Sequence, residues 1–94
     1  MTVVHNAYTV GTTPVLIAEI PEKNPTTSVH IVNDDNSSIY VGDSAVATSG
    51  ADKGMTVKKD SIYTLELNAL DKLYAVAAVA TGANAVSVVY SRVI

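Results

Sequence analysis

The stretch Val29–Thr48, with the sequence VHIVNDDNSSIYVGDSAVAT, decides the fold that the chain is expected to adopt. Val29 and Ile31 are separated by one residue, and Ile39 and Val41 repeat this spacing after a polar interruption. Successive side chains of a β-strand point to opposite faces, so each aliphatic pair would share one face of a strand. The stretch therefore predicts two short strands whose apolar faces anchor the core of a β domain.

The residues between these two strands predict a tight reversal of the chain. The run Asn33–Ser38 consists of Asn, Asp and Ser, whose short side chains hydrogen-bond to nearby backbone and tolerate left-handed conformations. These features predict a hairpin. The segment Gly42–Ser44 is expected to end the second strand, because glycine weakens a strand and marks a bend.

Outward from this centre, short segments rich in Val, Ile, Leu, Thr and Tyr alternate with turns that contain Gly, Pro, Asn or Asp. Strands are expected within residues 2–10, 15–20, 45–48, 55–58, 61–67, 73–80 and 85–94. Segment 2–10 has a second interpretation as an extended arm, and the alanines of segment 73–80 also have helix propensity, although its length and flanks favour a strand. About seven to nine short strands separated by turns are typical of a β-sandwich or barrel.

The predicted fold class is therefore all-β, an antiparallel β-sandwich or jelly-roll-like domain. It is expected to occupy residues 1–94 as a single domain, with residues 1–12 as a candidate N-terminal arm. Two segments predict which side chains face the core. Tyr63, Leu65 and Leu67 share one face of the first segment, and the second segment places together Val86, Val88, Tyr90, Arg92 and Ile94.

Composition limits how such a domain is stabilised. The chain has 94 residues and no Cys, so neither disulfides nor thiolate zinc sites reinforce it. Hydrophobic residues make up 48% of the chain, yet Phe and Trp are absent and the only aromatic residues are five Tyr. Charged residues make up 16%, below the roughly 25% of ordinary soluble domains, so much of the surface must be Thr, Ser, Asn and Ala. Such a surface is expected of a subunit that assembles with neighbours, and it is also compatible with a secreted or otherwise robust monomer.

Charge and hydropathy argue against two classes of partner. The net charge is −3, and the six Lys and Arg residues are scattered except for Lys58–Lys59, so a nucleic-acid partner is not expected. The beginning MTVVHNAYTV lacks a basic region followed by an apolar run, and no apolar segment reaches membrane-spanning length. Neither a signal peptide, nor a transmembrane helix, nor a membrane partner is expected.

No motif indicates catalysis or a bound cofactor. His5 and His30 are the only histidines, and both are interpreted as surface or interface residues. The run Asn33–Asn36 offers oxygen ligands but lacks the spaced acidic pattern of a calcium loop, so a solvated turn is expected. No nucleophile elbow occurs. We therefore expect no catalytic, cofactor-binding or metal-ligating residues, and no enzyme.

The tyrosines leave one binding function open. Tyr63 and Tyr90 are expected in or near the core, while Tyr40 and Tyr74 are candidates to share an opposite face. Exposed tyrosines serve as platforms for sugars or as interface anchors. A carbohydrate-binding module of jelly-roll type is therefore an alternative function, and a glycan contact stays an open alternative.

A set of short motifs resembles a known group of proteins. These motifs are Ile39-Tyr40-Val41-Gly42-Asp43, then Val46 and Thr48, then Gly50 and Met55, then the Leu65/Leu67 strand, and finally Leu73-Tyr74-Ala75-Val76. The pattern, which runs from about Val29 to Val89, resembles small β-sandwich virion structural proteins of tailed bacteriophages.

The resemblance implies a non-enzymatic capsid decoration or cement protein that binds the assembled head shell and stabilises it. It implies the major capsid protein as partner, a location in the virion after assembly in the host cytoplasm, and no cofactor. A small tail, fibre-base or baseplate component is the alternative. A homo-oligomer is expected, with a trimer favoured. The residues expected to meet the shell or sister subunits are Thr2, Val3, Val4, His5, Asn6, Tyr8, Asp34, Asp35, Asp52 and Lys53.

Overall fold

The computed structural model describes residues 2–93, and within them all regular structure is β-strand. This confirms the all-β fold class. The strands are β1 (Thr2–Tyr8), β2 (Val15–Glu19), β3 (Thr27–Asn33), β4 (Ile39–Gly42), β5 (Met55–Val57), β6 (Ser61–Leu67), β7 (Lys72–Val76) and β8 (Val86–Arg92).

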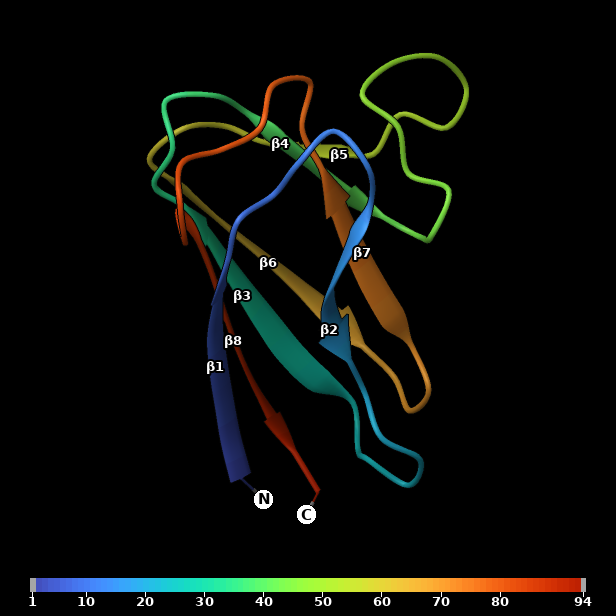
Figure 1. Cartoon of the computed structure of the whole chain (residues 1–94). Coiled ribbons are helices and arrows are strands. Elements are labelled where there is room, and N and C mark those ends of the chain that lie inside the picture. The colour runs from blue at the N-terminus through green and yellow to red at the C-terminus, as the bar shows by residue number, and fades with distance from the viewer. Residues whose placement is uncertain (1, 94) are drawn as a thin grey trace.

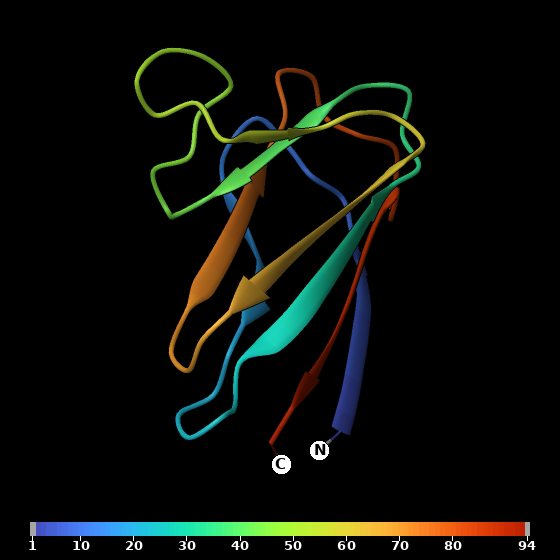
Figure 2. The same ribbon diagram turned by 180° about the vertical axis from the view of Figure 1, so that it is seen from behind.

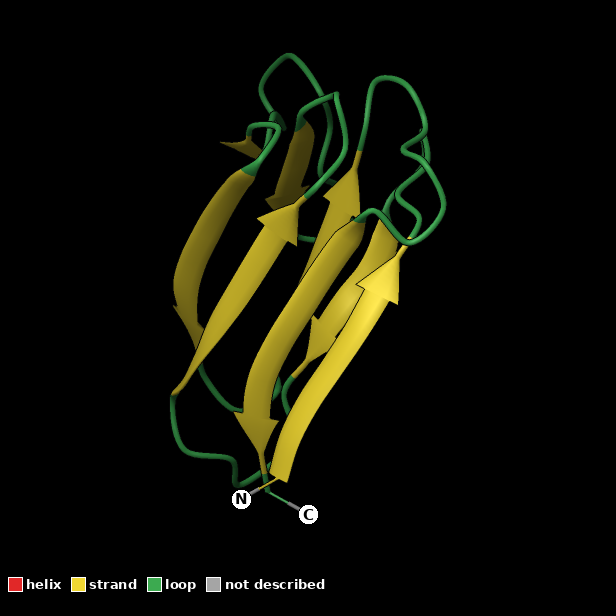
Figure 3. Cartoon of the chain, turned by 90° about the vertical axis from the view of Figure 1, so that its left-hand side faces the viewer, coloured by secondary structure: helices red, strands yellow, loops and turns green. Residues whose placement is uncertain are grey.

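The strands form two four-stranded sheets that pack face to face as a β-sandwich (Figures 1 and 3). The first sheet has the order β1-β8-β3-β6 and the second has the order β2-β7-β4-β5, and all strand pairs are antiparallel. This is the strand order of a jelly roll. Only β4 and β5 are consecutive in the chain and also adjacent in a sheet, so every other connection between described strands crosses from one sheet to the other.

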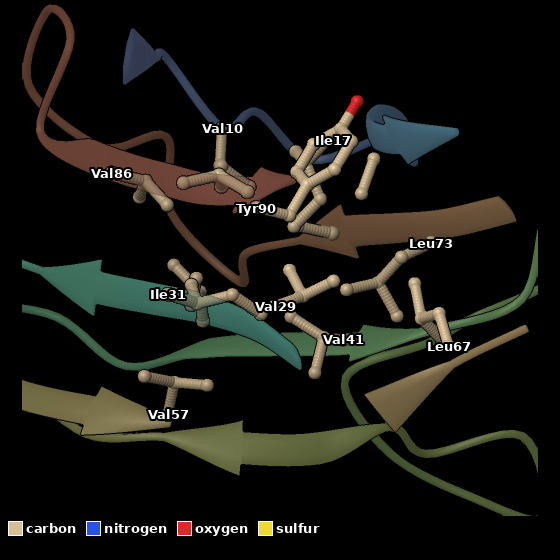
Figure 4. Packing of buried hydrophobic residues seen from close by; sticks show 14 of the residues in the cluster. Val10, Ile17, Val29, Ile31, Val41, Val57, Leu67, Leu73, Val86 and Tyr90 are labelled. Carbon is tan, nitrogen blue, oxygen red and sulfur yellow. The ribbon is translucent and has the colours of Figure 1, made fainter. Parts of the chain in front are cut away.

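Alternating aliphatic residues on the inner faces of both sheets form the core (Figure 4). Val29 and Ile31 of the first sheet and Ile39 and Val41 of the second are all at most 2% exposed. Full burial of one such side chain contributes about 1.5–3 kcal/mol to folding. The predicted role of these four residues as core anchors is confirmed.

The core faces predicted for the later strands are also confirmed. In β8, Val86, Val88 and Tyr90 point inward and are buried, whereas Arg92 is exposed at the strand end and Ile94 lies outside the described residues. In β6, one face packs against the core and the other is exposed. The period-two pattern predicted these faces correctly because each strand has one face toward the core and one face toward solvent.

The hairpin predicted around Asn33–Ser38 is wrong. β3 lies in the first sheet and pairs with β6 and β8, whereas β4 lies in the second sheet and pairs with β5 and β7. The polar run is therefore a connection between sheets. Turn-forming residues indicate that the chain reverses direction, but they do not determine which strand the following segment pairs with.

Asn33 fixes this connection from inside the sandwich. Its side chain is fully buried, and its amide nitrogen donates to the carbonyl oxygens of Ser37 at 2.8 Å and Val57 at 3.0 Å. Its amide oxygen accepts a hydrogen bond from the backbone nitrogen of Asp35 at 3.0 Å. One buried side chain thus ties the end of β3 to the connection and to β5 of the opposite sheet.

The N-terminal segment is a strand rather than an arm. β1 pairs with β8 residue for residue from Thr2 to Tyr8, and the start of β1 lies beside the end of β8 (Figure 2). After β1, the backbone nitrogen of Val10 donates to the Thr81 hydroxyl at 3.0 Å, and the backbone nitrogen of Thr81 donates to the Val10 carbonyl at 2.8 Å. These contacts fix the segment that follows β1.

The predicted segments 2–10, 55–58 and 85–94 form strands that are one to three residues shorter, and three other predicted segments differ more from the structure. Segment 45–48 contains only an isolated parallel bridge between Ala47 and Lys53. Segment 73–80 forms a strand only as far as Val76. Segment 15–20 becomes an edge strand with a register shift between Leu16 and Ala18, which explains why apolar residues occupy both of its faces.

Candidate functional site

The outer face of the first sheet carries few charged side chains. It consists of the outward-pointing residues of four strands, and we call it the low-charge face. Its members are Val3, His5 and Ala7 of β1, Ser87, Val89 and Ser91 of β8, Ser28, His30 and Val32 of β3, and Ile62, Thr64 and Glu66 of β6. Glu66 is its only formally charged residue, and β6 is an edge strand of the sheet.

The middle of this face is a row of four cross-strand neighbours. Val89 is paired with His5 on one side and with His30 on the other, and His30 is paired with Thr64. The Nδ1 atom of His30 lies 3.0 Å from the Thr64 hydroxyl oxygen, within hydrogen-bond distance. A shallow hollow of about 150 Å³ lies around these histidines and Val89. It is smaller than the roughly 300–1,000 Å³ that is typical of small-molecule pockets.

The β1 residues predicted at an interface divide between the two faces of the strand. Val3 and His5 are exposed on the low-charge face, and Thr2 and Asn6 are also exposed. Val4 and Tyr8 instead pack against the core.

Tyr8 lies in a partly apolar environment beside a second tyrosine. Burial raises the pKa of the Tyr8 phenol, the neighbouring Tyr90 raises it further, and a hydrogen bond from Asn6 lowers it. The phenol therefore stays neutral at physiological pH and acts in packing.

Asp34 and Asp35 lie in the connection between β3 and β4, and their roles differ. Asp34 is exposed. The Asp35 carboxylate accepts hydrogen bonds from the backbone nitrogens of Gly82 at 2.9 Å and Ser37 at 3.0 Å. These two bonds lower the pKa of Asp35. Asp35 thus joins two loops that are far apart in sequence, which is a structural role that the expected solvated turn did not include.

Replacing Asp35 with asparagine is expected to lower the melting temperature at neutral pH. A carboxyl with a lowered pKa in the folded state stabilises the protein above its unfolded-state pKa of about 3.9, and this contribution is lost as pH falls through the folded-state value. The difference between wild type and variant should therefore shrink below about pH 4. Thermal melts from pH 7 to pH 2.5 measure it, with Asp34→Asn as the control that removes an equal charge from an exposed neighbour. If the difference in melting temperature between wild type and Asp35→Asn stayed constant across this pH range, the ionised Asp35 carboxylate would not be what stabilises the fold.

Asp52 and Lys53 belong to the connection between β4 and β5, on the second sheet. Both are exposed, and the Lys53 ammonium lies 5.9 Å from the centre of the Tyr40 ring, within cation–π distance. An open hollow of about 320 Å³ lies beneath this connection and is lined in part by Gly42, Asp43 and Lys53.

Tyr40 and Tyr74 lie on the outer face of the second sheet, as the alternation predicted. They belong to the adjacent strands β4 and β7, where Tyr40 is paired with Val76 and Gly42 is paired with Tyr74. The two tyrosines are therefore diagonal neighbours, which places their Cα atoms roughly 7–8 Å apart. Leu16 of β2 is paired with Tyr74 from the other side. We call Leu16, Tyr40 and Tyr74 the tyrosine face.

The ten residues predicted at an interface therefore lie in three separate places. Those of β1 lie along one edge of the first sheet, Asp34 and Asp35 lie in the β3–β4 connection, and Asp52 and Lys53 lie in the β4–β5 connection; Figures 1 and 2 show these three segments. Val89, Val32 and Ile62 also lie on the low-charge face, and no pattern in the sequence marked them as candidate interface residues. Their common face follows from strand pairing, which no local pattern reveals.

No chemical centre is evident among residues 2–93. They contain no group of three or more His, Asp or Glu that could hold a metal ion, and every buried polar side-chain atom described has a hydrogen-bond partner. No helix in the same range has the length and hydropathy that a membrane span requires. His30 and Thr64 lie on an open sheet face, not in a cleft that would exclude water.

Comparison with known proteins identifies no relative. No family model matches the chain, and neither a curated protein nor a solved structure matches it.

Proposed function

We propose that the chain is a non-enzymatic structural protein of a bacteriophage particle, which decorates the assembled head and stabilises it by binding the major capsid protein. The single observation that carries this proposal is the low-charge face. Support also comes from the motif resemblance between Ile39 and Val76. The jelly-roll fold is compatible, since it occurs in viral capsid domains, but it also occurs in lectins and enzymes, so the fold alone does not select a function.

The low-charge face has the chemistry of an interface core. Interface cores are depleted in Lys, Glu and Asp, and this face has no Lys, Arg or Asp and a single Glu. Val3 is 65% exposed and Ile62 is 69% exposed, at the two edges of the sheet. Burying these side chains against a partner would release apolar surface from water at about 25 cal/mol per Å².

A shell that is already assembled would gain stability from such a subunit by mass action. A protein that binds only the assembled lattice shifts the equilibrium toward that lattice. The backbone of the low-charge face is already ordered by the strand pairing of the sheet. Binding through this face should therefore cost little additional conformational entropy. We therefore expect the low-charge face to be covered on the particle, and the tyrosine face to stay outside this contact.

Binding to heads that lack this chain tests the proposal. Particles from a phage deleted for the gene are mixed with purified protein and sedimented, and the bound fraction is measured. Val89→Lys, at the centre of the low-charge face, should weaken binding at least about tenfold, because it places an unpaired charge in the contact. The matched control Thr56→Lys adds the same charge to an exposed position of β5 on the second sheet and should bind like wild type.

Three outcomes would count against the proposal. Failure of the wild-type protein to bind heads would overturn the decoration function, and binding to purified tails would support the tail or baseplate alternative. Equal loss of binding in both lysine variants, with unchanged melting temperatures, would show that the low-charge face is not specifically the contact surface.

A second candidate function is carbohydrate binding through the tyrosine face. The diagonal placement of Tyr40 and Tyr74 on adjacent strands favours it, because two neighbouring aromatic rings offer a platform for a sugar. A glycan array probed with wild type should then give signals that Tyr40→Ala and Tyr74→Ala abolish and that Thr64→Ala, at an exposed position of the first sheet, leaves intact. An array without wild-type binding would rule this candidate out.

A further inference from the structure

The four edge strands of the sandwich differ in how they are protected from pairing with other chains. The first sheet ends at β1 and β6, and the second ends at β2 and β5. An edge strand presents unpaired backbone N–H and C=O groups, which pair readily with another strand. Proteins prevent this with short edge strands, bulges, prolines or charged side chains.

Three of the four edges carry such protection. β5 has only three residues. β2 has five residues, is interrupted by a register shift after Leu16, and ends at Glu19, whose carboxylate lies 3.8 Å from the Lys72 ammonium. β6 carries Glu66 and directly follows the charged turn 58–60. Each of these edges is therefore short, irregular or charged.

β1 carries none of these protections. It has seven residues, it pairs with β8 from Thr2 to Tyr8 without a register shift, and its sequence TVVHNAY contains no Pro and no Asp, Glu, Lys or Arg. Among the described residues no strand pairs with its other side. A regular, uncharged edge of this length is a feature that natural sheets avoid in a free protein.

We propose that β1 pairs with β1 of a second copy of this chain, antiparallel and about a two-fold axis, so that two four-stranded sheets become one sheet of eight strands. An antiparallel pair of identical strands is isologous, so the same edge serves both copies and closes the assembly at two. The strand has no formal charge, so self-pairing brings no like charges together.

The same pairing joins the two low-charge faces. Val3, His5 and Ala7 lie on this face at the edge that pairs, so the faces of the two copies meet side by side. The dimer would present a continuous surface of twice the width. The proposed β1–β1 pairing does not depend on the proposed function. A dimer that forms in solution but does not bind heads would support the pairing and contradict the decoration function.

The proposed β1–β1 contact buries a small area, and we therefore expect a weak affinity. A strand of seven residues is about 23 Å long, and a contact of this size buries less than the roughly 800 Å² per partner of a standard interface. We expect a reversible dimer whose dissociation constant is of the order of micromolar.

The solution mass as a function of concentration tests the proposal. Sedimentation equilibrium of the wild-type chain should show a shift from 9.8 kDa toward twice that mass as concentration rises. The double variant Val3→Lys/Ala7→Lys places lysines on both halves of β1, so like charges meet across the two-fold axis, and it should stay monomeric. The control Ile62→Lys/Thr64→Lys adds the same charge to the same face at the β6 edge and should dimerise like wild type.

Cysteine cross-linking provides a second measurement that does not depend on lysine variants folding. The chain contains no Cys, so an introduced cysteine is unique. Near a two-fold axis a residue faces its own copy, so at least one of Val3→Cys, His5→Cys and Ala7→Cys should form a disulfide dimer under mild oxidation, and Thr64→Cys should not. A monomer at every concentration, a mass three times that of the chain, or cross-linking only through Thr64→Cys would overturn the proposal.

Discussion

Replacing Asn33 with alanine is expected to lower the free energy of unfolding by about 3–4 kcal/mol. The side chain is fully buried, and its loss leaves the Ser37 and Val57 carbonyls and the Asp35 backbone nitrogen without their partner. The bond to Val57 is buried and the other two are partly buried. A fully buried polar group left unpaired costs about 1–3 kcal/mol, and water can partly replace the other two partners. Urea denaturation monitored by far-UV circular dichroism measures the change.

The neighbouring Asn36 provides the control. It is exposed, and Asn36→Ala should change stability by no more than about 0.5 kcal/mol. Asn33→Asp keeps the shape of the side chain but replaces the donor to two carbonyls with an acceptor, so it should destabilise the protein strongly as well. If Asn33→Asp had wild-type stability, the donated hydrogen bonds would not be what holds the β3–β4 connection.

Replacing Gly54 with alanine is expected to cost about 2–3 kcal/mol. A Cβ atom at this position would lie 2.5 Å from the Val41 carbonyl oxygen and would also overlap the Val46 side chain. The Val41 carbonyl belongs to the β4 backbone, so the strain can be relieved only if the β4–β5 connection moves away from the sheet. Thermal or urea denaturation of the variant measures the cost.

Gly11→Ala is the matched control for this substitution. A Cβ atom at Gly11 has no neighbouring atom within 4 Å, so the change should be neutral or slightly stabilising. Equal stability of the two alanine variants would show that the β4–β5 connection does not pack against β4 as described.

The fold class and the core were predictable because they depend on local periodicity. Val29, Ile31, Ile39 and Val41 alternate with polar residues, and this pattern alone assigns them to the inner face of a sheet. The pairing of strands was not predictable in the same way. The polar run after Asn33 reads equally well as a hairpin or as a connection between sheets, because both need the same turn-forming residues.

The candidate site was predictable only in part, for a related reason. The sequence indicated β1 and a surface with few charges, but it could not show that Val3, Val89 and Ile62 lie on one face, since they belong to strands far apart in the chain. Asp35 looked like a solvated residue because its partner Gly82 is distant in sequence. Contacts between segments far apart in the chain determine which residues share a face and which side chains are partners, and local patterns in a single sequence do not show these contacts.

We propose that this chain is a structural part of a phage particle, and the amount of the chain in purified particles tests this proposal. Particles from cells that carry the gene are banded by density, and the chain is quantified by mass spectrometry relative to the major capsid protein. We expect a fixed ratio of the two proteins across all particle fractions, with the chain retained in heads after tails are removed. A chain that is present in the lysate but absent from banded particles would contradict this proposal.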